Sequence, residues 1–149
     1  ELKFDVTGGV FFNNKNMNFA DYKHFNGNQT FFLLNKPSSD LSFLSTRSQI
    51  SEFHNLKYYT LSTNTKFVEY HVSHNFRGFF LGKIPLLRKL KFYEIVGING
   101  VATETGTYNE VYVGVDKILK IFRFDIGTAL NQNNKIDLFY RFGLRLSMF

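Results

Sequence analysis

The last fourteen residues of the chain, 136–149, alternate between two kinds of side chain. The odd positions are mostly polar, small or charged and include Asp137, Arg141 and Arg145, whereas every even position is apolar. The apolar set consists of Ile136, Leu138, Tyr140, Phe142, Leu144, Leu146 and Met148. Because successive side chains of a β-strand point to opposite faces, the pattern predicts a strand with one apolar face and one polar face.

The length of this alternation favours a membrane strand. A strand that crosses a membrane needs roughly 9 to 11 tilted residues, whereas the usual soluble strand has about 5 to 6. A soluble sandwich would also alternate, with its apolar face on a core, so the last strand alone leaves both classes open. The number of similar strands elsewhere in the chain must therefore distinguish a membrane protein from a soluble one.

Five further segments alternate in the same way, at residues 2–12, 67–77, 92–103, 109–118 and 120–130. The pattern is least regular in 92–103, where Glu94 falls on the apolar side. The residues predicted to face lipid are Val68, Tyr70, Val72, Phe122, Phe124, Ile126, Tyr140, Phe142, Leu144, Leu146 and Met148. The polar residues predicted to face a lumen are Glu69, His71, Arg77, Arg123, Asp125, Arg141 and Arg145. These patterns predict an all-β fold, an antiparallel transmembrane β-barrel.

The connections indicate an up-and-down meander. Residues 105–107 and 131–134 have turn composition, and 116–119 leave almost no room between two strands, so neighbouring strands must be antiparallel. The Asn- and Ser-rich region 13–51 predicts long loops, and Pro85 predicts a short helical turn within an interfacial connection at 82–91. With the chain's end on the periplasmic side, the long loops fall outside the cell and 82–91 falls inside.

Composition removes several classes of protein. The chain has no cysteine, which excludes disulfide scaffolds, thiol catalysis and cysteine-based metal sites. The sequence contains no run of about 18 apolar residues, so it predicts no transmembrane helix. Its aromatic content of 18% is typical of the interfacial girdles of a barrel. The net charge of +6 comes from cations that are scattered except near 88–91, so no nucleic-acid partner is expected.

Few residues suggest chemistry. Glu69 and His71 share a strand face near His74, but two candidate ligands on one strand are not a coordination set, so a hydrogen-bonded polar lumen is favoured over a metal site or an acid and base pair. For the predicted inward charges on 120–130 and 136–149, structural pairing is favoured over a selectivity lining. Neither His24 nor His54 suggests a role. No nucleophile elbow, phosphate-binding loop or paired-carboxylate motif is present, so we expect neither an enzyme nor a cofactor.

Several segments together resemble a known family. They are 24–28, 58–64, 67–71, 75–79, 83–90, 94–97, 113–115 and 122–125, of which 83–90, Lys-Ile-Pro-Leu-Leu-Arg-Lys-Leu, is the most specific. They resemble a Bacteroidota family of outer-membrane barrel proteins of unknown function, whose members often carry an N-terminal carboxypeptidase-regulatory-like domain. The resemblance implies that residues 1–149 are the C-terminal portion of a larger barrel in the cell outer membrane. Its partners would be outer-membrane lipid and other outer-membrane proteins or lipoproteins.

A second likeness is fainter. Phe76-Arg77-Gly78-Phe79 resembles the Arg-Gly-Phe loop of the BamA and TamA superfamily, which enters the barrel from outside and would imply a role in outer-membrane protein assembly or secretion. The predicted strands place this loop on the periplasmic side instead. We therefore expect a non-catalytic structural, transport or assembly role, with the BamA-like factor and a soluble β-sandwich binding module as alternatives.

Overall fold

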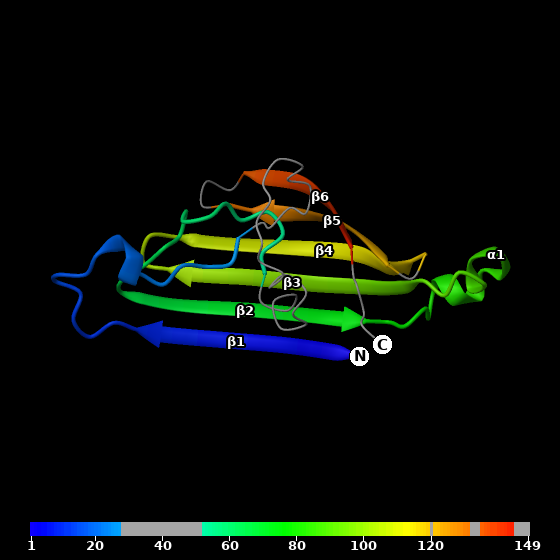
Figure 1. Cartoon of the computed structure of the whole chain (residues 1–149), viewed down its shortest axis with the longest axis horizontal. Helices are drawn as coiled ribbons and strands as arrows, with labels where there is room; N and C mark the ends of the chain where they lie inside the picture. The colour runs from blue at the N-terminus through cyan, green and yellow to red at the C-terminus, as the bar shows by residue number, and fades with distance from the viewer. Residues whose placement is uncertain (28–51, 120, 132–134, 145–149) are drawn as a thin grey trace.

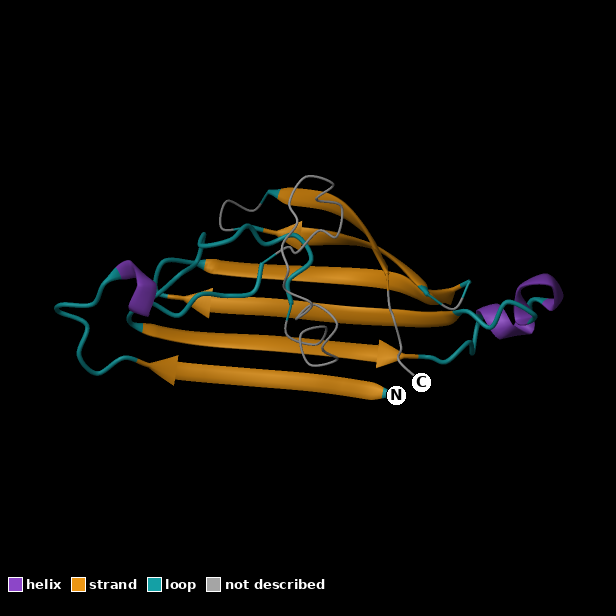
Figure 2. Ribbon diagram, viewed as in Figure 1, coloured by secondary structure: helices purple, strands orange, loops and turns teal. Residues whose placement is uncertain are grey.

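The chain folds into one six-stranded antiparallel sheet whose strands are paired in chain order (Figures 1 and 2). The computed structural model describes residues 1–27, 52–119, 121–131 and 135–144. The strands are β1 (Leu2–Val10), β2 (Lys66–Asn75), β3 (Tyr93–Thr103), β4 (Thr107–Ile118), β5 (Phe122–Leu130) and β6 (Ile136–Leu144). The predicted all-β antiparallel meander is confirmed, and the sheet is open between β1 and β6 in the described part of the chain.

Each strand lies where alternation predicts one, with small differences at the ends. The first two strands stop two residues earlier than predicted, at Val10 and Asn75. Between β4 and β5 the register shifts after Val115, and Lys117 and Leu119 adopt positive φ angles of 61° and 50° in the tight turn. The end of the last predicted strand, with Arg145, Leu146 and Met148, lies outside the described residues.

Within the described residues, the connections contain only short helical pieces. In the described part of the long β1–β2 connection there is a 3-10 turn at Phe19–Asp21, and Lys23 forms an isolated bridge with Thr63. The β2–β3 connection has a 3-10 turn at Leu81–Lys83 followed by α1 (Pro85–Arg88), which confirms the helical turn predicted at Pro85. Among the described residues, no helix has the length and apolar content needed to cross a membrane.

The two faces of the sheet have opposite environments. One row across the apolar face runs through Phe4, Val72, Ile98, Val111, Thr128 and Leu138. Many side chains on this face are exposed: Phe4 by 73%, Leu138 by 74% and Tyr140 by 80%. Between them, Tyr70 lies across Gly100 on β3 and donates a hydrogen bond of 2.6 Å to Asn109 Oδ1 on β4, so Gly100 provides the space for the ring.

The opposite face is polar, and part of the β1–β2 connection covers it. Phe53 and Leu56 pack there against strand residues such as Tyr108, Tyr112 and Phe139. Figure 1 shows this segment crossing the middle of the sheet before it enters β2. The buried part of the molecule therefore lies on the polar face, and the apolar face is left open.

Candidate functional site on the polar face

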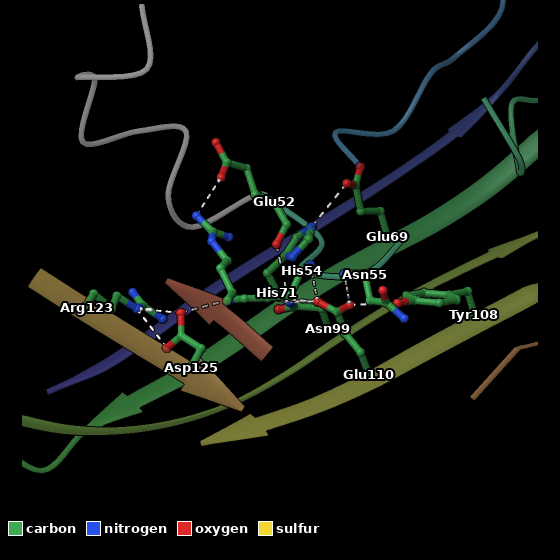
Figure 3. A network of polar contacts seen from close by, with 11 residues as sticks. Glu52, His54, Asn55, Glu69, His71, Asn99, Tyr108, Glu110, Arg123 and Asp125 are labelled. Carbon is green, nitrogen blue, oxygen red and sulfur yellow. Dashed lines mark hydrogen bonds and ion pairs between the residues drawn. The ribbon is translucent and has the colours of Figure 1, made fainter. Parts of the chain in front are cut away.

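The carboxylate of Glu110 is the centre of the buried network (Figure 3). Glu110 is on β4 and only 1% exposed. Its Oε1 accepts hydrogen bonds from His54 N at 2.7 Å and from Asn99 Nδ2 at 2.7 Å. Its Oε2 accepts from Asn55 N at 3.1 Å and from the Tyr108 hydroxyl at 2.8 Å. Since a carboxylate ion only accepts, His54 Nδ1, at 2.9 Å from Oε1, is a fifth donor.

The chain segment that supplies three of these donors is the strap, which we define as residues 52–56. His54 is the best-anchored side chain of the strap, because its Nε2 lies 3.7 Å from Asp125 Oδ2 on β5. Its ring packs against those of Tyr112 and Phe139, with centroids 4.0 and 5.9 Å away. One histidine thus connects the strap to β4, β5 and β6 at once.

Glu52 and Phe53 hold the beginning of the strap. Arg141 Nη2 on β6 lies 3.4 Å from Glu52 Oε2, and the backbone N–H of Phe53 donates to Asn26 O at 2.9 Å. The Phe53 ring is fully buried between His71, 4.7 Å away, and Tyr108, 5.7 Å away. Buried hydrogen bonds and aromatic packing together therefore hold the strap against the sheet, and these contacts are those of a structural segment.

Glu69 and His71 form a separate pair on β2. His71 Nε2 lies 3.1 Å from Glu69 Oε1, and Lys23 Nζ lies 3.5 Å from Glu69 Oε2. His74 lies on the other, apolar face, where it pairs with Val96. No group of three or more His, Asp or Glu side chains in the described residues is arranged to hold a metal ion. The geometry of Glu69 and His71 is that of an internal hydrogen-bonded pair.

The remaining predicted inward charges are distributed as follows. Arg123 Nε donates to both oxygens of Asp125 at 2.9 Å, and Arg141 reaches the strap, so these three residues belong to the polar face. Arg77 lies outside the sheet, because β2 ends at Asn75, and it is exposed. Its guanidinium donates to Glu1 Oε2 at 3.1 Å and lowers the pKa of that carboxyl.

The residues predicted to face lipid share the apolar face as far as the structure describes them. Val68, Phe124, Ile126, Tyr140 and Phe142 are exposed, and Leu144 pairs with Phe122 in the register. Tyr70, Val72 and Phe122 are half-buried on the same face. Leu146 and Met148 are outside the described residues.

Sequence reasoning missed the strap. His54, Asn99 and Tyr108 carry no motif, and a strap without periodicity gives no signal that it will fold onto a sheet. One indirect signal indicated that a covering segment is needed. Glu69, Glu110 and other carboxylates on the inward strand faces require hydrogen-bond donors when they are buried. That requirement does not say which loop supplies them.

The fold and the site define a class: an antiparallel meander whose buried face is polar and whose exposed face is apolar. The chain belongs to a family of unknown function, because the model of the DUF5686 C-terminal domain family matches residues 1–115. The matched region contains the strap and nearly all of β1–β4. No curated protein and no solved structure matches the chain. The expectation of a family of unknown function is therefore confirmed.

Proposed function

We propose that this chain is part of the wall of an outer-membrane β-barrel, with lipid on its apolar face and the strap inside the lumen. The observation that carries the proposal is the inverted burial of the sheet. Glu110 and Asp125 are each 1% exposed, while large apolar side chains on all six strands are open. A soluble protein rarely exposes a continuous apolar patch of more than a few hundred Å². Lipid is the environment that suits such a face.

The dimensions of the sheet support this proposal. Strands of 9 to 12 residues rise about 3.3 Å per residue, and a tilt of about 40° leaves a height of roughly 23–30 Å. That height is close to the apolar band of outer-membrane barrels, which is about 25 Å.

Closure of the barrel requires more strands than the structure describes. A membrane offers no water to hydrogen-bond the outer edges of β1 and β6, so the sheet must close, and the smallest filled barrels have about eight strands. We infer that the chain supplies the C-terminal portion of a larger barrel, and the description of the family as a C-terminal domain supports this. The likeness to Bacteroidota proteins supports a Gram-negative outer membrane as the location.

The loops support an orientation. The connection between β1 and β2 is by far the longest, and it leaves and re-enters the sheet at one end, where Val10 pairs with Lys66. The β2–β3 connection with α1 lies at the other end (Figure 1). Outer-membrane barrels place long loops outside the cell and shorter ones in the periplasm. The strap then enters the lumen from the extracellular side.

The proposed role is non-catalytic: structural, in transport, or in assembly with other outer-membrane proteins or lipoproteins. The strap favours an occupied lumen over an open diffusion pore, because polar contacts attach it to four strands, β3–β6. For the BamA-like alternative the structure gives no support, since Arg77 is exposed and lies just past the end of β2, in the β2–β3 connection.

Fractionation tests the proposal and the soluble alternative together. Envelopes of cells that make the full-length protein would be washed with carbonate and salt, then extracted with detergent. The proposal predicts that the protein stays in the outer-membrane fraction until detergent is added. Recovery in the aqueous fraction without detergent would refute it and favour the soluble β-sandwich.

A further inference from the structure

The connection between β2 and β3 concentrates the positive charge of the chain. Residues 77–91 contain Arg77, Lys83, Arg88, Lys89 and Lys91 but no Asp or Glu. The net charge of the whole chain is +6, so the residues outside this stretch carry a net charge of only +1. The rest of the protein is nearly neutral, and this one connection is strongly basic.

All five cations are exposed, and four of them are open to an external partner. Arg77 is paired with Glu1, but Lys83, Arg88, Lys89 and Lys91 have no carboxylate partner within the described residues. Lys83 does have one intramolecular contact, since its Nζ lies 4.2 Å from the centre of the Phe79 ring. A basic surface of this kind attracts phosphate groups.

The same connection exposes large apolar side chains. Phe79, Phe80, Ile84 and Leu90 are all at least 45% exposed. Aromatic and aliphatic side chains interleaved with cations are typical of segments that lie in the headgroup layer of a membrane. We call residues 77–91 the basic connection.

The basic connection has a defined position relative to the sheet. The buried carboxylate of Glu94 on β3 accepts hydrogen bonds from the backbone N–H of Gly78, at 2.9 Å, and from that of Leu81. The backbone N–H of Phe76 donates to Glu94 O at 2.9 Å. Figure 1 shows that α1 extends past the ends of the strands. The basic connection is therefore fixed just beyond the apolar face.

We propose that the basic connection binds the headgroups of anionic phospholipids in the leaflet that faces the periplasm. This inference rests on the proposed function, in which the apolar face contacts acyl chains. Where that face ends, the next layer of a bilayer consists of phosphates. Lys83, Arg88, Lys89 and Lys91 lie in the same connection as exposed Phe79 and Phe80. A lipid presents acyl chain and phosphate side by side, which matches an apolar face that continues into a basic surface. An acidic protein segment would match only the charge.

A charge-matched pair of variants tests this proposal in the full-length protein. The first variant, K83Q/R88Q/K89Q/K91Q, removes four cations from the basic connection. The control, K15Q/K57Q/K66Q/K135Q, removes four exposed cations outside the basic connection. Two of them are in the β1–β2 connection, one is at the start of β2 and one directly precedes β6. Binding of phosphatidylglycerol would be titrated in zwitterionic micelles, with phosphatidylcholine and inorganic phosphate as competitors, and circular dichroism would check that both variants are folded.

The expected result is selective loss of phosphatidylglycerol binding. Each cation near an anionic surface contributes roughly a fivefold effect, so the loss of four cations should weaken binding by about 600-fold. The control should stay within about twofold of the parent. F79S/F80S should also weaken binding of the lipid, since the rings lie at headgroup level.

Three outcomes would overturn the inference. They are equal losses in the first variant and the control, no preference for phosphatidylglycerol over phosphatidylcholine, and displacement of the lipid by millimolar inorganic phosphate. In each case a protein that still requires detergent for extraction would leave the proposed function standing. Recovery without detergent would instead refute the proposed function itself.

Discussion

Replacing Glu110 with glutamine should release the strap while the sheet stays folded. The substitution preserves the shape of the side chain but turns one acceptor oxygen into a donor NH₂ group. If the amide oxygen occupies the position of Oε1, the N–H of Asn55 loses its acceptor, which lies 3.1 Å away in the parent. The Tyr108 hydroxyl can rotate and accept from the new NH₂ group, so the loss at Asn55 is the minimum effect.

The size of this effect follows from the charge and burial of the site. A hydrogen bond to a charged group contributes about 1.5–3 kcal/mol, and Glu110 is 1% exposed, so little water is available to replace it. A loss of 1.5–3 kcal/mol corresponds to an increase of roughly 10- to 150-fold in local opening. The N–H groups of His54 and Asn55 should then exchange faster by about that factor.

Hydrogen exchange in detergent micelles measures this opening residue by residue. The strap should lose protection, whereas the β3–β4 ladder, including the N–H of Val101, should change little. Glu104→Gln is the matched control, because Glu104 is exposed in the turn between the same two strands. Unchanged exchange in the strap of E110Q would refute the reasoning, and so would a uniform loss of protection over the whole sheet.

Two further predictions concern the two faces of the sheet. Gly127→Ala should lower folding yield and destabilise the protein by about 1–3 kcal/mol, because a Cβ there would collide with the β4 backbone and the ring of Phe139. Gly143→Ala, with open space around it, should be neutral in the same urea unfolding experiment. Val113→Arg, near the middle of the apolar face, should lower the free energy of unfolding in lipid by about 2–4 kcal/mol. Val10→Arg, at the end of a strand, should lower it by roughly 0–1 kcal/mol. Equally small effects of both substitutions in reconstituted vesicles would contradict a lipid-facing sheet.

The strands could be predicted because each carries its own signal. Alternation is a local property, and in β6 it placed Tyr140 and Phe142 on the apolar face without knowledge of any neighbour. Tight connections then required antiparallel neighbours, which fixed the order of the sheet. Strand ends were less accurate. Arg77 continues the alternation of β2, but the chain turns before it, with a positive φ of 53° at that residue.

The strap could not be predicted, because its signal is tertiary. His54 contacts Glu110, which is 56 residues away in the sequence, and Asp125 on the next strand. No rule of sequence spacing predicts either contact. A histidine in a polar loop more often faces water. Glu94 is an intermediate case: its position on the apolar side was evident, but its role as acceptor for the basic connection required the coordinates.

Spin-label accessibility tests the central claim, that the apolar face contacts lipid, most directly. Residues 1–149 contain no cysteine, so single labels can be placed on β1 without background from this part of the protein. Phe4→Cys and Val6→Cys place a label on the apolar face, and Asp5→Cys and Thr7→Cys place one on the polar face. In reconstituted vesicles, labels at 4 and 6 should collide mainly with oxygen, and labels at 5 and 7 mainly with a water-soluble nickel chelate. Frequent collisions of the nickel chelate with labels at 4 and 6 would contradict a lipid-facing sheet. So would labels at 4 and 6 that collide with neither oxygen nor the nickel chelate.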